Sequence, residues 1–392
     1  MVNHPDLIRQ ITIKEFDHFM NHRNAFNAGD DKNLFGDSVF SMKDQKWKDM
    51  RSTLSPAFTG SKMRSMFELI RETAEASVKF LQQEKGNKPI LDIELKDFFR
   101  RYANDVIATT AFGFKIDSMT DRDNEFFKMG QEVTTFGTVA SMKFFLINNF
   151  RTLSKFLKLS FFTKRQTKYY MNMVLGAMKH RFDNKIHRPD MVNMMMETRG
   201  MFLDNAHNKP LKEWTDSEIV AQCFVFFFAG FESSSNALCF TVHELIENLA
   251  IQEKLKQEVM EVAEKLNGKP LSYEALNSMK YMDTVVAEAL RKWPLAANTD
   301  RICTKDVEIQ DPETGETILI KAGETVMIPI VGLQRDPEYY PNPLKFDPDR
   351  FSDENKHNIK PNTYLPFGCG PRICIGQRFK SIDSLRFCLY TI

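Results

Sequence analysis

The sequence is poor in several features that would place it in common functional classes. Its six cysteines are scattered over 392 residues, so no secreted disulfide framework is predicted and a reducing compartment is the default. The net charge is only +1, which gives no reason to expect nucleic-acid binding. The longest apolar run extends from Cys223 to Phe231, far short of the roughly 20 residues of a membrane-spanning helix. No glycine-rich dinucleotide motif or phosphate-binding loop is found.

Apolar residues, at 42% of the chain, instead recur mainly with helical periodicity. Short β runs follow within 300–345, and that region ends in the start of a proline-rich meander. No linker divides the chain, so we expect one domain over 1–392, mainly α with a small β region. The expected helices are 5–24, 43–54, 61–85, 92–111, 122–139, 164–186, a long central helix at 215–249, 251–266 and 282–293.

The loop 367–376 contains three glycines and a proline, which exclude regular structure and permit close backbone approach. Cys374 stands at the start of a helical pattern, Ile375 to about Tyr390, where the helix dipole favours a thiolate. Arg372 offers a guanidinium to a carboxylate. These groups together predict a pocket for iron porphyrin with Cys374 as the axial ligand. A buried cysteine in a turn is the ordinary alternative.

Three further patterns have both an ordinary and a functional interpretation. Trp47 and Arg51 share one helix face and could donate to an acidic group, or simply stack at the surface. Gly230, inside the long helix, costs about 1 kcal/mol relative to alanine. It indicates close approach of a flat ligand, a kink, or packing on a neighbouring helix. Glu288 and Arg291 form an i,i+3 pair of the kind usually seen at surfaces.

Taken together, these motifs resemble the cytochrome P-450 (haem-thiolate monooxygenase) superfamily, whose Phe-x-x-Gly-x-Arg-x-Cys-x-Gly signature is matched at 367–376. The resemblance extends from the first helix to Arg378 and is strongest to animal microsomal members, with insect clan three, family nine as the best match. It implies haem with Cys374 as the metal ligand. It further implies cofactor contacts from Trp47, Arg51, Arg301, Arg372, Phe367, Gly368, Gly376, Ala229 and Gly230, a proton relay through Glu232 and Ser233, and a structural lock of Glu288, Arg291 and Arg350.

The activity implied by the resemblance is insertion of one atom of dioxygen into a lipophilic small molecule. Electrons would come from a separate NADPH-dependent flavoprotein reductase, since the chain has no dinucleotide motif. The implied location is the cytosolic face of the endoplasmic reticulum membrane. The substrate pocket would use 25–42, the Phe-rich segment 142–162, 225–233 and Leu295 to Thr299, and a basic reductase-docking face would use Lys43, Lys46, Lys48, Arg378 and Lys380.

Several alternatives stay open on the sequence. The Phe-rich segment 142–162 suits a membrane-interface patch, the roof of a pocket, or plain helix packing. A haem-thiolate isomerase or dehydratase would share the ligand but need no reductase, and a haem-binding protein without turnover is a second rival. A zinc or iron–sulfur site at Cys369 and Cys374 is a weak alternative, because no other ligand lies nearby at suitable spacing. Compared with the family, the chain is expected to be partial, without the N-terminal anchor and the last β hairpin.

Overall fold

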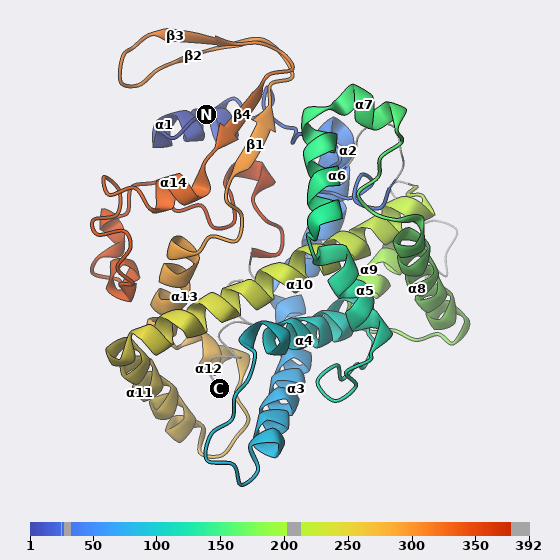
Figure 1. Cartoon of the computed structure of the whole chain (residues 1–392), viewed down its shortest axis with the longest axis vertical. Coiled ribbons are helices and arrows are strands. Elements are labelled where there is room, and N and C mark those ends of the chain that lie inside the picture. Colours follow the sequence, from blue (N-terminus) through green and yellow to red (C-terminus); the bar gives the residue numbers. More distant parts are fainter. Residues whose placement is uncertain (25, 27–32, 202–212, 378–392) are drawn as a thin grey trace. The chain divides into compact units, whose positions relative to one another are not determined.

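The computed structural model describes residues 1–24, 26, 33–201 and 213–377 (Figure 1). The chain divides into two compact units, which are considered separately below. One unit comprises Asn24–Glu232, and the other combines Met1–Arg23 with Ser233–Ile392. The expectation of a single domain over 1–392 stays a prediction.

The Asn24–Glu232 unit is built from helices. Several of their ends have clear local causes: Thr163 and Gln166 form a capping box at the start of α8, and Gly86, at φ +47°, ends α3. Two of these helices, α6 and α7, lie within the Phe-rich segment that the sequence left open. The helices are α2 (Asp44–Leu54), α3 (Gly60–Lys85), α4 (Leu95–Ile107), α5 (Glu125–Thr134), α6 (Thr138–Asn149), α7 (Arg151–Phe156), α8 (Lys164–Asp183), α9 (Met191–Thr198) and the first half of α10 (Asp216–Glu247).

Aromatic side chains of α10 form the centre of this unit's core. Phe227 lies 5.7 Å from the Tyr170 ring of α8 and 5.0 Å from the Phe126 ring of α5, measured between centroids. Gly130 of α5 faces Phe227 so closely that an added Cβ would lie 2.6 Å from the ring. Close packing of this kind fixes how α5 and α8 lie against the first half of α10.

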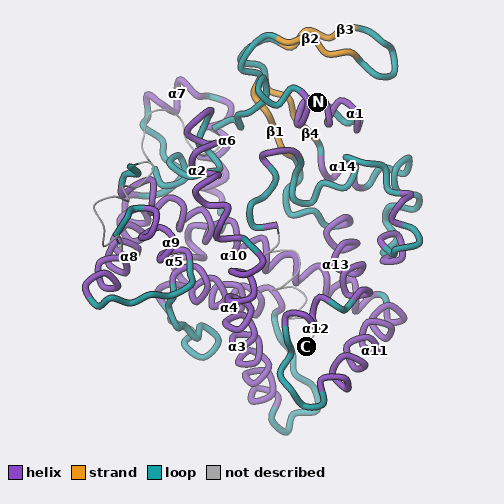
Figure 2. Tube along the Cα trace, turned by 180° about the vertical axis from the view of Figure 1, so that it is seen from behind, coloured by secondary structure: helices purple, strands orange, loops and turns teal. Residues whose placement is uncertain are grey.

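The other unit combines the N-terminal helix, the second half of α10, the later helices and both sheets (Figure 2). Each sheet has two antiparallel strands: β1 (Thr299–Ile302) pairs with β4 (Thr325–Ile328), and β2 (Val307–Gln310) pairs with β3 (Thr317–Ile320). The helices are α1 (Pro5–Arg9), continued by a π-helical turn over Gln10–Lys14, α11 (Leu249–Leu266), α12 (Tyr273–Asn277), α13 (Lys280–Lys292) and α14 (Ile330–Gln334).

The long central helix α10 begins where the sequence predicted. Thr215 and Glu218 form its capping box, with the Thr215 N–H donating to the Glu218 carboxylate at 2.8 Å. Its length and mean hydropathy of 1.3 would suffice to cross a membrane, but 56% of its most apolar window is buried inside the protein. This is the pattern of a core helix. The helix is α-helical throughout, Gly230 included.

The mainly α fold with a small β region is confirmed, with local differences. The helix expected over 5–24 ends at Lys14, and the one expected over 122–139 ends at Thr134. Strand β1 was not predicted as a strand, because its four residues have no clear alternation of apolar and polar side chains. The helix expected from Ile375 to Tyr390 lies outside the described residues beyond Gln377.

Candidate active site

The cysteine loop 367–376 has a defined backbone. The Cys374 N–H donates to the Phe367 carbonyl at 2.9 Å, closing the loop on itself. Gly368 and Gly370 have φ values of +74° and +69°, which favour glycine. At Gly370 an added Cβ would lie 2.2 Å from the Thr12 carbonyl oxygen, whereas at Gly368 the space is open. The sequence predicted that the backbone of this loop comes close to another group. At Gly370 that group is the π-helical turn Gln10–Lys14 of the same chain.

The two cysteines of the loop have different environments. Cys369 is buried, its thiol lies 3.3 Å from the Thr12 hydroxyl, and burial raises its pKa. Cys374 is half-buried, and Gly376 lies beside its sulfur, with an added Cβ at 4.0 Å. No group of three or more metal-ligating side chains occurs among the described residues.

Arg301 of β1 supplies a buried cation beside this loop. Its side chain is 1% exposed, and burial lowers its pKa. Its guanidinium donates to the carbonyl oxygens of Asp300 at 2.7 Å and Cys369 at 3.3 Å and to the Thr299 hydroxyl at 3.3 Å, while Nε has no hydrogen-bond partner within the part of the chain that the structure describes. A buried guanidinium that meets only neutral acceptors and retains an unused donor fits a carboxylate ligand. The donor set therefore fits the carboxylates of a porphyrin.

Arg372 belongs to the loop itself, at the end of its short 3₁₀ turn Gly370–Arg372. Its Nε donates to the Met20 carbonyl at 2.8 Å. Arg301 and Arg372 therefore both belong to the unit that carries Cys374. The predicted donors Trp47 and Arg51 lie in the other unit on α2, where Trp47 is buried and Arg51 half-buried.

The central segment of α10 carries the predicted acid and alcohol. At Gly230 an added Cβ would lie 2.9 Å from Cδ1 of Ile107 on α4, so this glycine permits close helix packing. Ala229 and Ser233 are half-buried on the same helix. Packing on a neighbouring helix, one of the interpretations left open, is thus seen at Gly230.

Glu232 has two cationic partners from α4. Lys96 lies 2.7 Å from its carboxylate, and Arg100 contacts both oxygens at 3.1 Å. Burial alone would raise the pKa of Glu232, but the hydrogen bonds and charges of Arg100 and Lys96 outweigh it, so the pKa lies below its usual value. Glu232 is therefore a carboxylate at neutral pH.

Glu288, Arg291 and Arg350 come together as predicted. Both Glu288 and Arg291 are fully buried, joined at 2.6 and 2.8 Å, and Nε of Arg350 lies 3.5 Å from Glu288. Burial raises the pKa of Glu288 although both arginines oppose it. Arg291 also donates to the carbonyls of Gln334 and Pro343, at 2.7 and 2.8 Å. The cluster fastens the proline-rich meander to α13.

Gln334 is a functional residue that the sequence did not reveal. Its amide nitrogen donates to the Leu290 and Arg291 carbonyls at 3.0 and 2.9 Å, and its oxygen accepts the Leu365 N–H at 2.7 Å. It thereby joins the end of α13 to the chain two residues before Phe367. A single glutamine among polar residues carries no signal for this role, which depends on residues far apart in sequence.

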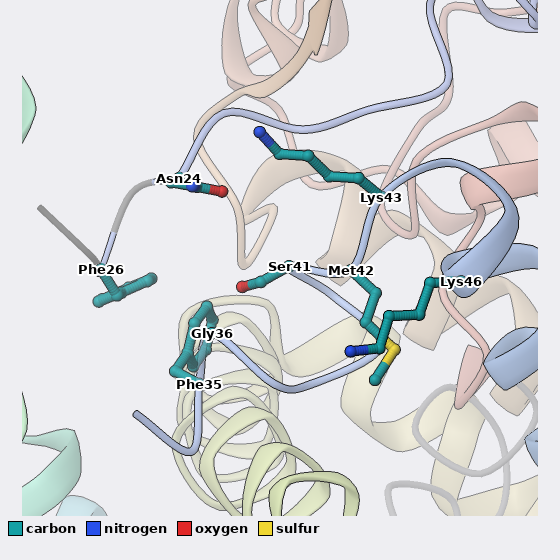
Figure 3. A pocket seen from close by; sticks show the side chains of 8 residues that line it. All are labelled: Asn24, Phe26, Phe35, Gly36, Ser41, Met42, Lys43 and Lys46. Carbon is teal, nitrogen blue, oxygen red and sulfur yellow. The ribbon is translucent and has the colours of Figure 1, made fainter. Parts of the chain in front are cut away.

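A hollow of about 300 Å³ lies in the Asn24–Glu232 unit, at the segment where a substrate pocket was predicted. Figure 3 shows Phe26 and Phe35 on one side and the side chains of Lys43 and Lys46 extending from the other. Phe26 also lies within 5.8 Å of the Phe228 ring of α10. The hollow is therefore continuous with an aromatic cluster, made of Phe26, Phe35, Phe136, Phe144, Phe161, Phe162 and Phe228.

Comparison with known proteins gives the same family throughout. Residues 1–385 match the family described as Cytochrome P-450. The chain is 50% identical to Probable cytochrome P-450 9f2 of Drosophila melanogaster, over 100% of this chain and 77% of that protein. It is 44% identical to Cytochrome P-450 9b2 of Drosophila melanogaster, over 96% and 74%. It is 36% identical to Cytochrome P-450 3A16 of Mus musculus, over 97% and 73%. The expected likeness to insect family nine is confirmed.

Proposed function

The chain belongs to the cytochrome P-450 family, uses haem with a cysteine thiolate ligand and is a monooxygenase, and from this premise we propose its substrate class, electron donor and site residues. It inserts one atom of dioxygen into a lipophilic small molecule, with electrons from a separate NADPH-dependent flavoprotein reductase. The observation that carries the site assignment is Arg301, a buried guanidinium beside the loop of Cys374 whose hydrogen-bond acceptors among the described residues are all neutral oxygens.

The residues proposed to hold the haem are those that the family resemblance implies. Cys374 ligates the iron, and haem held by a thiolate supplies the oxygen-insertion chemistry. Arg301 and Arg372 bind its carboxylates together with Trp47 and Arg51. The open space at Gly368 leaves the loop backbone accessible to a flat ligand. Further contacts come from Phe367, Gly376, Ala229 and Gly230.

Glu232 and Ser233 relay protons along α10. The Ser233 hydroxyl can both donate and accept, while Lys96 and Arg100 hold Glu232 as an acceptor. Ser234, the next residue and buried, provides a matched control. Ser233→Ala should lower the yield of product per NADPH consumed, and Ser234→Ala should not. Equal yields from both variants would remove Ser233 from the relay.

A lipophilic substrate is supported by the aromatic cluster and the hollow beside it. Exposed Lys43 and Lys48 of the predicted docking face suit an acidic reductase surface, whereas Lys46 is paired with Glu218. Arg378 and Lys380 lie outside the described residues. Association with a membrane surface, as at the endoplasmic reticulum, is supported by apolar side chains exposed on and beside α6 and α7: Val139, Met142, Phe145, Phe150, Leu153, Phe156 and Leu157.

The experiment that tests this function combines the purified haem-loaded protein with such a reductase, NADPH and a fluorogenic alkyl aryl ether. We expect NADPH consumption, release of the phenol and one labelled oxygen atom from dioxygen in the aldehyde formed by the alkyl group. Conversion of an oxygenated lipid without NADPH would instead favour an isomerase or dehydratase. Intact haem binding without turnover of a panel of such ethers and lipids would favour a haem-binding role.

A further inference from the structure

The short segment Met20–Arg23 is fixed beside β1, which carries Arg301, and beside Arg372 of the cysteine loop. Its Met20 carbonyl accepts from Arg372 at 2.8 Å, and its Asn21 carbonyl accepts the Ile302 N–H of β1 at 2.8 Å. The Arg23 N–H donates to the Asp300 carboxylate at 2.7 Å. Three successive contacts therefore hold this segment between β1 and the 3₁₀ turn of Arg372.

His22 lies within this fixed segment and is 7% exposed. Its Nδ1 is 3.6 Å from a carboxylate oxygen of Asp300. The charged groups that act on it are Asp300 and Arg301 from β1 and Arg372 from the loop, with Arg23 adjacent on its own segment. A single carboxylate thus stands among three arginines and one histidine, a cluster with an excess of positive charge.

The excess of positive charge around His22 favours the neutral form of its imidazole. Burial lowers its pKa, and the charges of Arg301 and Arg372 lower it further, although the nearby carboxylate of Asp300 raises it. The imidazole is therefore neutral at pH 7. A ligand with two carboxylates would offset the arginine charges and so raise the same pKa.

We propose that His22, held by Asp300, is a proton-linked positioning residue of the haem-carboxylate site: its imidazole takes up one proton from solvent when the haem carboxylates bind at Arg301 and Arg372. This rests on the roles proposed above for those two arginines, but it needs neither the substrate nor the reductase. The imidazolium then adds a third cation on the side of the cluster formed by Met20–Arg23.

The direction of the pH dependence follows from linkage. A histidine whose pKa is higher with haem than without it strengthens haem binding below the lower pKa and loses this contribution as the pH rises through the higher one. A hydrogen bond to a charged group changes an equilibrium by at least about tenfold. Haem release should therefore accelerate about tenfold between roughly pH 6 and pH 8, where histidine titrates.

The test measures transfer of haem from the haem-loaded protein to an excess of apomyoglobin, followed by absorbance over this pH range. We expect release from the wild type to accelerate as the pH rises, release from His22→Gln to be fast and flat, and release from His22→Arg to be slow and flat. Loss of haem through protonation of the thiolate would accelerate in the opposite direction, toward acid, so the two effects separate by sign.

Three further variants keep the outcome decisive. Asp300→Asn removes the group that raises the His22 pKa, so it should move the acceleration to lower pH even if His22→Gln does not fold. Arg301→Gln and Arg372→Gln should each release haem faster at every pH. If these two release haem at the wild-type rate, the carboxylate site itself is wrong. If they accelerate release while His22→Gln and Asp300→Asn keep the wild-type pH profile, only the role of His22 is overturned.

Discussion

Neutralising Glu288 should destabilise the protein strongly, although this residue is not one of those proposed to bind the haem. Glu288 is fully buried, receives two hydrogen bonds from Arg291 and one from the Asp347 N–H at 2.9 Å, and lies near Arg350. Removing one partner of a buried ion pair leaves an uncompensated buried charge and costs about 3–5 kcal/mol. Because the glutamine of Glu288→Gln can still accept from Arg291, we expect about 3 kcal/mol, the lower end of this range.

The assay is urea unfolding of the haem-loaded protein at pH 7.5, followed by far-ultraviolet circular dichroism and by haem absorbance. A matched control is Lys256→Gln, which removes an i,i+3 ion pair between exposed side chains of α11 and should cost less than about 0.5 kcal/mol. The absorbance of Glu288→Gln should fall at a lower urea concentration than its dichroism, because the meander connects the cluster to the cysteine loop. If Glu288→Gln unfolds at the same urea concentration as Lys256→Gln, the lock does not stabilise this protein.

Three further predictions concern other parts of the chain. The stability difference between the wild type and Glu232→Gln should be present at neutral pH and be lost as the pH falls from the ordinary glutamate pKa of 4.5 through the lower pKa of Glu232, because a carboxylate with a lowered pKa stabilises only while ionised; urea midpoints across pH measure it, and a constant difference would contradict it. Gly370→Ala should lower the haem content of the purified protein far more than Gly368→Ala, since both have positive φ but only Gly370 would clash with Thr12; similar losses would refute the close approach. Phe145→Ser with Phe156→Ser should weaken binding to phosphatidylcholine vesicles in a flotation assay, whereas Phe182→Ser, also exposed but on α8, should not; equal binding of the wild type and both variants would exclude α6 and α7 as the membrane-contacting surface.

The parts of the site that the sequence predicted are those with local signals. The glycines and cysteine of 367–376 and the capping box at Thr215 act within a few residues of themselves, so a pattern reveals them. The partner of Glu288 and Arg291 on the meander was predicted only through family resemblance. The sequence could not show why position 230 is a glycine, because the answer depends on contact with Ile107, which is 123 positions away along the chain.

Other residues carried no signal because their roles depend on segments brought together by folding. Gln334 accepts a hydrogen bond from Leu365, 31 positions away along the chain, and His22 lies beside Asp300, 278 positions away. Neither residue type is unusual in its local sequence. Helix ends were similarly misjudged where apolar periodicity continued past the true end, as at Lys14 and Thr134.

The central claim is that the sulfur of Cys374 ligates haem iron, and its most direct measurement is the absorption spectrum of the reduced protein with carbon monoxide. The wild type should show the strongly red-shifted Soret band of thiolate ligation, and Cys374→Ala should lose that band, whereas Cys369→Ala should keep it wherever haem is retained. A red-shifted band that survives in Cys374→Ala would contradict the account.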